Sequence, residues 1–195
     1  VAFMRDNNLF IKDLAKGVEI QFTHDGRYNH IINGAPDWVY EEEFSFSQGF
    51  FWSPDSKKIA FYKFDESNVK EFRMEEFYDL YPEWYSFKYP KAGTRNAKAS
   101  VVVYDILYKS LKTISVPEDD HYIPRIRWTL DNDKLALFTV NRRQNRLCMY
   151  LANARSTVTE PVYTEQNETG WVDYGNIDEW QFLTDNNMLV VSEQD

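Results

Sequence analysis

A β-hairpin is predicted by the segment Trp52-Ser53-Pro54-Asp55-Ser56-Lys57-Lys58-Ile59-Ala60-Phe61-Tyr62. Aromatic and β-branched residues towards its ends favour strands, whereas Pro, Asp and Ser between them favour a tight turn. The same pattern recurs at residues 128–138 (WTLDNDKLALF) and, more loosely, at residues 182–191 (FLTDNNMLVV). Three copies of one hairpin indicate a repetitive all-β fold.

A second hairpin pattern alternates with the first. Residues 8–14 (NLFIKDL), 101–106 (VVVYDI) and 147–153 (LCMYLAN) each read as a strand that leads through a polar turn into another short strand. An inner hairpin with a Trp-Ser-Pro-Asp turn and an outer hairpin with a Tyr-Asp turn would then form one repeating unit. Two hairpins supply four strands, which is the number in a propeller blade.

The spacing of the turn residues supports this unit. Asp105 precedes Asn153 by 48 residues and Asp131 precedes Asp185 by 54, a period suited to propeller blades. Asp55 precedes Asp131 by 76 residues, so that blade carries an insertion. Regularly spaced short strands also occur in β-sandwiches, but the paired hairpins favour a propeller. We predict an all-β fold over residues 1–195, a partial β-propeller of about three to four four-stranded blades from a larger ring.

The insertion, at about residues 65–98, is rich in aromatic residues. It contains Phe72, Phe77, Tyr78, Tyr81, Trp84, Tyr85, Phe87 and Tyr89 among many charges. Such a surface is typical of protein interfaces, because large rigid side chains bury area at a small entropic cost. A flap packed on its own domain is the alternative, and the residues alone favour neither.

Composition restricts the class of ligand. The net charge of −9 argues against nucleic acid, because a phosphate-binding surface needs clustered Lys and Arg. A neutral or cationic ligand fits better, although ordinary solubility also explains the charge. No apolar run approaches the roughly 18 residues of a membrane span. Val1 already lies in an expected strand, so a leader or an anchor upstream of it stays open.

The sequence offers no catalytic nucleophile, metal site or cofactor site. Its seven glycines contain no pair spaced as in Gly-x-Ser-x-Gly. His24, His30 and His121 are scattered and lack a metal-binding partner at a suitable spacing. Cys148 has no second thiol, and we expect it to be a small buried hydrophobic residue.

An acidic run, Asp37-Trp38-Val39-Tyr40-Glu41-Glu42-Glu43-Phe44, follows the turn at residues 33–36. It predicts a short helix with Asp37 as N-cap, and three carboxylates at its start would interact well with the helix dipole. Alternatively, two of the carboxylates converge on a cation. A primary ammonium has three N–H donors that two carboxylates can accept together. Neighbours on a regular α-helix diverge by about 100°, so we expect a short, irregular or 3₁₀ turn.

Residues 37–43 resemble the double-glutamate motif of the dipeptidyl peptidase IV family. These proteins are serine exopeptidases with an eight-bladed propeller and an α/β-hydrolase domain. Four further segments occur in the order of that family and at similar spacing: residues 52–54 (WSP), 89–93 (YPKAG), 142–145 (RRQN) and 169–172 (TGWV). The resemblance therefore spans nearly the whole chain.

The resemblance implies roles for particular residues. Glu42 and Glu43 correspond to the glutamates that bind the substrate ammonium, and Glu41 is then structural. The aromatic insertion corresponds to a dimerisation arm, which implies a homodimer. An aromatic residue of the family's substrate pocket has no clear match after residues 169–172. Tyr174 is its expected substitute.

The resemblance also implies an activity for the parent protein. It would release N-terminal dipeptides, Xaa-Pro or Xaa-Ala, from peptides with a free N-terminus. The catalytic serine, aspartate and histidine belong to a hydrolase domain outside this chain, and a substrate-binding arginine lies upstream of Val1. We therefore expect this polypeptide alone to be inactive. A non-catalytic propeller scaffold of the same family is the alternative, and a periplasmic or extracellular location is implied.

Overall fold

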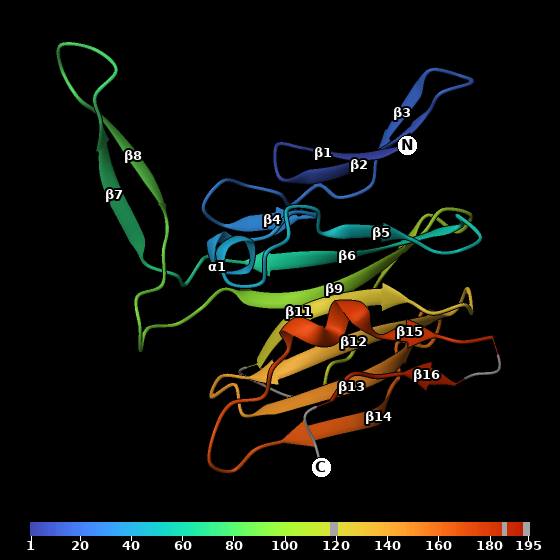
Figure 1. Ribbon diagram of the computed structural model, residues 1–195. Coiled ribbons are helices and arrows are strands. Elements are labelled where there is room, and N and C mark those ends of the chain that lie inside the picture. Colours follow the sequence, from blue (N-terminus) through green and yellow to red (C-terminus); the bar gives the residue numbers. More distant parts are fainter. Residues whose placement is uncertain (118–120, 185–186, 193–195) are drawn as a thin grey trace. The chain divides into compact units, whose positions relative to one another are not determined.

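The computed structural model describes residues 1–117, 121–184 and 187–192. These residues form antiparallel β-sheets, with a five-residue α-helix and a short 3₁₀-helix in the connections (Figure 1). The predicted all-β class is therefore confirmed. The chain divides into two compact units, residues 1–50 with 61–100, and residues 51–60 with 101–195.

The first unit begins with a three-stranded antiparallel sheet in the order β1-β2-β3. Its strands are β1 (Ala2–Arg5), β2 (Asn8–Asp13) and β3 (Val18–Gln21). Strand β4 (Ile31–Asn33) pairs with the end of β6 (Lys58–Asp65), where Ile32 faces Phe64. Buried aromatic residues close the core of this unit, with the rings of Phe22 and Phe61 6.0 Å apart.

The second unit contains a four-stranded antiparallel meander, as expected for a blade (Figure 1). Its strands are β11 (His121–Trp128), β12 (Lys134–Asn141), β13 (Arg146–Asn153) and β14 (Thr159–Gln166). The unit also contains β10 (Ser110–Thr113), β15 (Gln181–Phe182) and β16 (Met188–Leu189). Most of β5 (Phe50–Trp52) and of β9 (Lys98–Asp105) belongs to it as well. Trp180 fills the core against Phe138 and Tyr163, with ring centroids 5.3 and 5.2 Å away.

The inner hairpins turn as the sequence predicted. Between β5 and β6, Asp55 accepts a hydrogen bond from the Ser53 hydroxyl at 2.7 Å, and Ser53 Oγ accepts one from the Lys58 amide. Between β11 and β12, Thr129 Oγ1 accepts from the amide of Asp131, two residues further on, at 3.0 Å. Within each turn, short polar side chains thus accept hydrogen bonds from backbone amides that have no partner on a neighbouring strand. In the third copy, Asp185 and Asn186 lie outside the described residues.

The outer hairpins share a different turn. The side chains of Asp13, Asp105 and Asn153 each accept hydrogen bonds from the amides two and three residues further on, at 2.9–3.2 Å. Four residues after each acceptor, the backbone takes positive φ, as it does at Gly17 (68°), Lys109 (51°) and Thr157 (67°). The repeat read from the sequence therefore reflects one local structure formed three times.

The aromatic insertion is a two-stranded hairpin of β7 (Glu71–Glu76) and β8 (Glu83–Lys88) (Figure 1). It follows β6, whereas β12, the corresponding strand of the four-stranded sheet, is followed only by a short turn. Its base is bonded to the rest of the first unit, since Tyr28 donates a hydrogen bond from its hydroxyl to the Ser86 carbonyl at 2.7 Å. Its tip is open to solvent, with Tyr78 83% and Trp84 64% exposed.

Candidate functional site

The acidic run lies on a loop, residues 34–49, whose two ends meet. The Gly49 amide donates to the Gly34 carbonyl at 3.0 Å, and both glycines bond to the backbone of Tyr62 on β6. Gly34 has φ +82°, and a Cβ there would lie 2.5 Å from the Leu9 side chain. Only glycine fits this close approach, and the loop is therefore held firmly at its base.

Helix α1 (Trp38–Glu42) presents the glutamates. Asp37 is its N-cap, as predicted, and its Oδ1 accepts from the Tyr40 amide at 3.0 Å. The turn is short, as expected, but it is not irregular or 3₁₀, because its five residues form one α-helical turn. Glu42 is the last helical residue and Glu43 is the C-cap. The helix dipole therefore disfavours these two carboxylates and does not explain them.

Buried aromatic residues fix the other side of the helix. Tyr40 is almost completely buried, and its ring lies 4.6 Å from that of Phe64 on β6 and 4.9 Å from that of Phe44. Tyr40 and Phe44 are buried in the core, whereas Glu42 and Glu43 between them face solvent. Aromatic burial of this size stabilises the loop by about 2 kcal/mol or more for each side chain.

The two glutamates have unused hydrogen-bonding capacity. Within the described residues, neither Glu42 nor Glu43 forms an ion pair or a side-chain hydrogen bond. Each ionised carboxylate can accept several charge-assisted hydrogen bonds. On this α-helical turn the two side chains leave the backbone about 100° apart. A small cation with several N–H donors can bind both only where the long, solvent-facing glutamate side chains reach towards each other.

The first unit contains two buried acids whose proximity the sequence did not predict. Asp37 is 5% exposed and Glu66, just after β6, is 6% exposed. Burial raises the pKa of Asp37 to about 6. Burial, and then repulsion from the Asp37 carboxylate, raise the pKa of Glu66 to about 7. The two acids are 29 residues apart in sequence, and no local pattern marks Glu66.

Tyr174 belongs to the second unit and is described there by itself. It is the N-cap of the 3₁₀-helix η1 (Gly175–Glu179) and packs, partly buried, against the cluster around Trp180. Asp178 of η1 forms a salt bridge with Arg125 on β11 at 2.9 Å. The structure thus holds Tyr174 on an ordered turn, and its role in a substrate pocket stays a prediction.

Neither a metal-binding cluster nor a membrane-spanning helix occurs in the ranges that the structure describes. Across these residues, no three His, Cys, Asp or Glu side chains are grouped so that they could hold a metal ion. Nor does any helix in those ranges have the length and apolar character needed to cross a membrane. Cys148 is buried on β13, as expected.

Known proteins resemble this chain over most or all of its length. The family model for the dipeptidyl peptidase IV (DPP IV) N-terminal region matches residues 1–195. Dipeptidyl-aminopeptidase B of Aspergillus niger is 33% identical over 193 residues, which cover 89% of this chain and 21% of that protein. The protein in the crystal structure of Porphyromonas gingivalis dipeptidyl peptidase 4 is 43% identical in sequence, and the two structures match with a TM-score of 0.93. The match covers 100% of this chain and 28% of the Porphyromonas gingivalis chain. The chain thus spans less than a third of either relative, and its predicted partial β-propeller is confirmed.

Proposed function

The chain belongs to the family of dipeptidyl peptidase IV N-terminal regions, and we propose that it is the substrate-recognition part of a serine exopeptidase that releases N-terminal dipeptides. In this proposal Glu42 and Glu43 bind the free ammonium of the peptide. The observation that carries it is the pair of exposed, unpaired carboxylates on the rigid turn α1.

The chemistry of the pair explains why cleavage would stop at a fixed distance from the N-terminus. A primary ammonium donates three hydrogen bonds, and two carboxylates accept them while neutralising its charge. An acylated N-terminus has no charge and keeps only one N–H donor. Binding the ammonium on a fixed loop would place the peptide bond after the second residue at the catalytic nucleophile. This binding energy, gained away from the reacting bond, assists the reaction by orienting the substrate.

The test is the activity of full-length variants on a chromogenic Xaa-Pro substrate with a free amine. Glu42→Gln and Glu43→Gln each keep the side-chain shape but remove the charge, and we expect kcat/KM to fall about 100-fold, from the loss of about 3 kcal/mol. Glu41→Gln is the matched control and should change kcat/KM by less than about threefold. Unchanged activity of both Glu42→Gln and Glu43→Gln would sink the proposal.

The second residue of the released dipeptide is proposed to be Pro or Ala, with Tyr174 lining its pocket. This rests on the position of Tyr174 just after residues 169–172 and on its partly buried ring. The hairpin β7–β8 is proposed as the contact of a homodimer. Its open aromatic tip supports an interface better than a flap, because its largest side chains are not packed on the first unit.

A further inference from the structure

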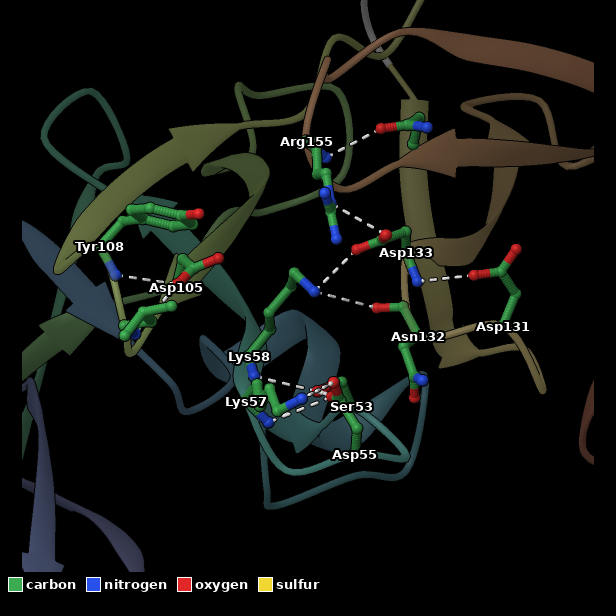
Figure 2. A network of polar contacts seen from close by, with 12 residues as sticks. Ser53, Asp55, Lys57, Lys58, Asp105, Tyr108, Asp131, Asn132, Asp133 and Arg155 are labelled. Atoms are coloured by element: carbon green, nitrogen blue, oxygen red, sulfur yellow. Dashed lines mark hydrogen bonds and ion pairs between the residues drawn. The ribbon is translucent and has the colours of Figure 1, made fainter.

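The second unit contains a polar pocket of about 340 Å³ that the proposed peptidase function does not use. It lies among the turns of the hairpins β5–β6, β9–β10 and β13–β14 (Figure 2). Four of its lining residues are cationic, against two acids, Asp55 and Asp105; the cations are Lys57, Lys58, Lys112 and Arg155. The lining therefore has an excess of positive charge, although the chain as a whole has a net charge of −9.

Two carboxylates, those of Asp55 and Asp105, also line the pocket, and both accept hydrogen bonds from their own hairpin turns. Asp55 accepts from the Ser53 hydroxyl and the Lys57 amide. Asp105 accepts from the two amides that lie two and three residues further on in its turn, at 3.0 Å each. The turns therefore use these acids as acceptors for their own donors.

Asp133 is occupied as well, although it lies next to the pocket. Figure 2 shows it between Lys58 and Arg155. Lys58 Nζ lies 2.7 Å from its Oδ1, and Arg155 Nε lies 2.9 Å from its Oδ2. Burial alone would raise the pKa of Asp133, but the hydrogen bonds from Lys58 and Arg155 hold it below its usual value. This carboxylate is thus ionised and paired with two cations.

The donors, in contrast, are still available. Lys112 Nζ donates to the Arg155 carbonyl at 2.6 Å, and among the described residues no carboxylate pairs with it. Arg155 uses Nε for Asp133, while its side chain is 73% exposed and its terminal nitrogens bond to nothing in the described part of the chain. An ammonium and a guanidinium with available donors therefore both line the pocket, and these two groups bind phosphate oxygens.

We propose that this pocket binds a small organic phosphate ester, with its phosphate on Lys112 and Arg155 and its body against Leu107 and Tyr108. The two latter side chains are largely exposed at the rim and offer apolar surface. The volume supports an ester over inorganic phosphate alone, because it exceeds what one tetrahedral anion fills.

The test is calorimetric titration of the full-length protein at constant ionic strength, with glucose 6-phosphate, inorganic phosphate and glucose as probes. We expect saturable binding of glucose 6-phosphate, roughly tenfold or more weaker binding of inorganic phosphate, and none of glucose. Equal affinity for inorganic phosphate would overturn the proposed organic ligand, and the absence of saturable binding would overturn the site.

Variants locate the site. Lys112→Gln and Arg155→Gln should each weaken glucose 6-phosphate binding by roughly tenfold or more. Lys112→Gln is decisive, because it breaks no ion pair of the described residues, and an unchanged thermal unfolding temperature shows that it folds. The matched control is Lys16→Gln, which removes the same charge from the exposed turn after β2. Unchanged affinity of Lys112→Gln, or an equal loss in Lys16→Gln, would overturn the proposal. Dipeptide release should be the same in all three variants.

Discussion

At the scale of single residues, Glu66 carries a charge in an unfavourable place. It is 6% exposed, and its pKa is raised from 4.5 to about 7 by burial and by the Asp37 carboxylate. Between these two pH values the folded chain binds more protons than the unfolded chain. The free energy of unfolding therefore falls as the pH rises through this window, and the full penalty is present above about pH 7.

The variant Glu66→Gln should remove this penalty. We expect it to raise the free energy of unfolding at about pH 8 by about 1–3 kcal/mol, and to leave it nearly unchanged at about pH 4. Denaturant unfolding of the chain at both pH values measures the difference. Glu75→Gln, on the exposed strand β7, is the matched control and should have no effect at either pH. A gain in stability of Glu66→Gln that is equal at both pH values would contradict the electrostatic explanation.

The sequence predicted part of the site at this scale. Asp37 was identifiable as an N-cap because capping depends on neighbours two or three residues away. The proximity of Glu66 to Asp37 was not predictable, since it depends on where the end of β6 lies in the folded unit. The type of helix was also predicted wrongly. The same residues can form a single turn of α-helix or of 3₁₀-helix, and sequence propensities do not distinguish the two.

At the scale of elements, the ion pair of Lys58 with Asp133 joins the β5–β6 turn to the β11–β12 turn. The Lys58 side chain is only 6% exposed, and it also donates to the Asn132 carbonyl at 3.4 Å. Removing one partner of such a pair leaves the other charge poorly compensated. Arg155 still contacts Asp133, which limits the loss.

We expect Lys58→Met to lower the free energy of unfolding by about 2 kcal/mol. The exposed neighbour Lys57 provides the control, and Lys57→Met should cost less than about 0.5 kcal/mol. Denaturant unfolding of both variants checks the difference. If the two substitutions cost the same, the bridge between the turns contributes nothing specific.

The hairpin β7–β8 leads to a prediction about assembly. Tyr78 and Trp84 expose large aromatic surfaces at its tip, and such surfaces are buried in protein interfaces. In the full-length protein, Tyr78→Ser combined with Trp84→Ser should weaken dimerisation by roughly tenfold or more without lowering the unfolding temperature. Sedimentation equilibrium measures the dissociation constant. Tyr108→Ser, a similarly exposed tyrosine in the second unit, is the control, and an unchanged dimer in the double variant would rule out this contact.

The elements themselves were largely predictable. Each outer turn uses an Asp or Asn acceptor followed four residues later by positive φ, and this local chemistry appears directly in the sequence. The order of inner and outer hairpins followed from the same repeats. The bridge from Lys58 to Asp133 did not, because the two residues are 75 positions apart and only the packing of neighbouring turns brings them together.

At the scale of the whole molecule, the repeats predicted the architecture but not its division. The outer type of turn occurs in both units, so nothing in the turns marks a boundary between residues 1–50 with 61–100 and the rest. Strands β5, β6 and β9 contain residues of both units. Such a division depends on the density of long-range packing, which a local repeat does not encode.

The three-stranded sheet β1-β2-β3 leads to the last prediction. Strand β3 is exposed at all four residues and bonds to β2 on one side, and no described strand pairs with its other side. A free edge that carries Val18 and Ile20, the latter 45% exposed, is a template for pairing with another chain.

We therefore expect the 195-residue chain, expressed alone, to self-associate at micromolar concentration in light scattering. Ile20→Lys should reduce this association, because a charge on the edge opposes strand pairing. The Tyr78→Ser and Trp84→Ser double variant distinguishes the two routes, since edge pairing should persist in it while contact through the hairpin tip should not. A chain that is monomeric before any substitution would contradict edge pairing outright. Association that survives Ile20→Lys but is lost in the double variant would assign it to the hairpin instead.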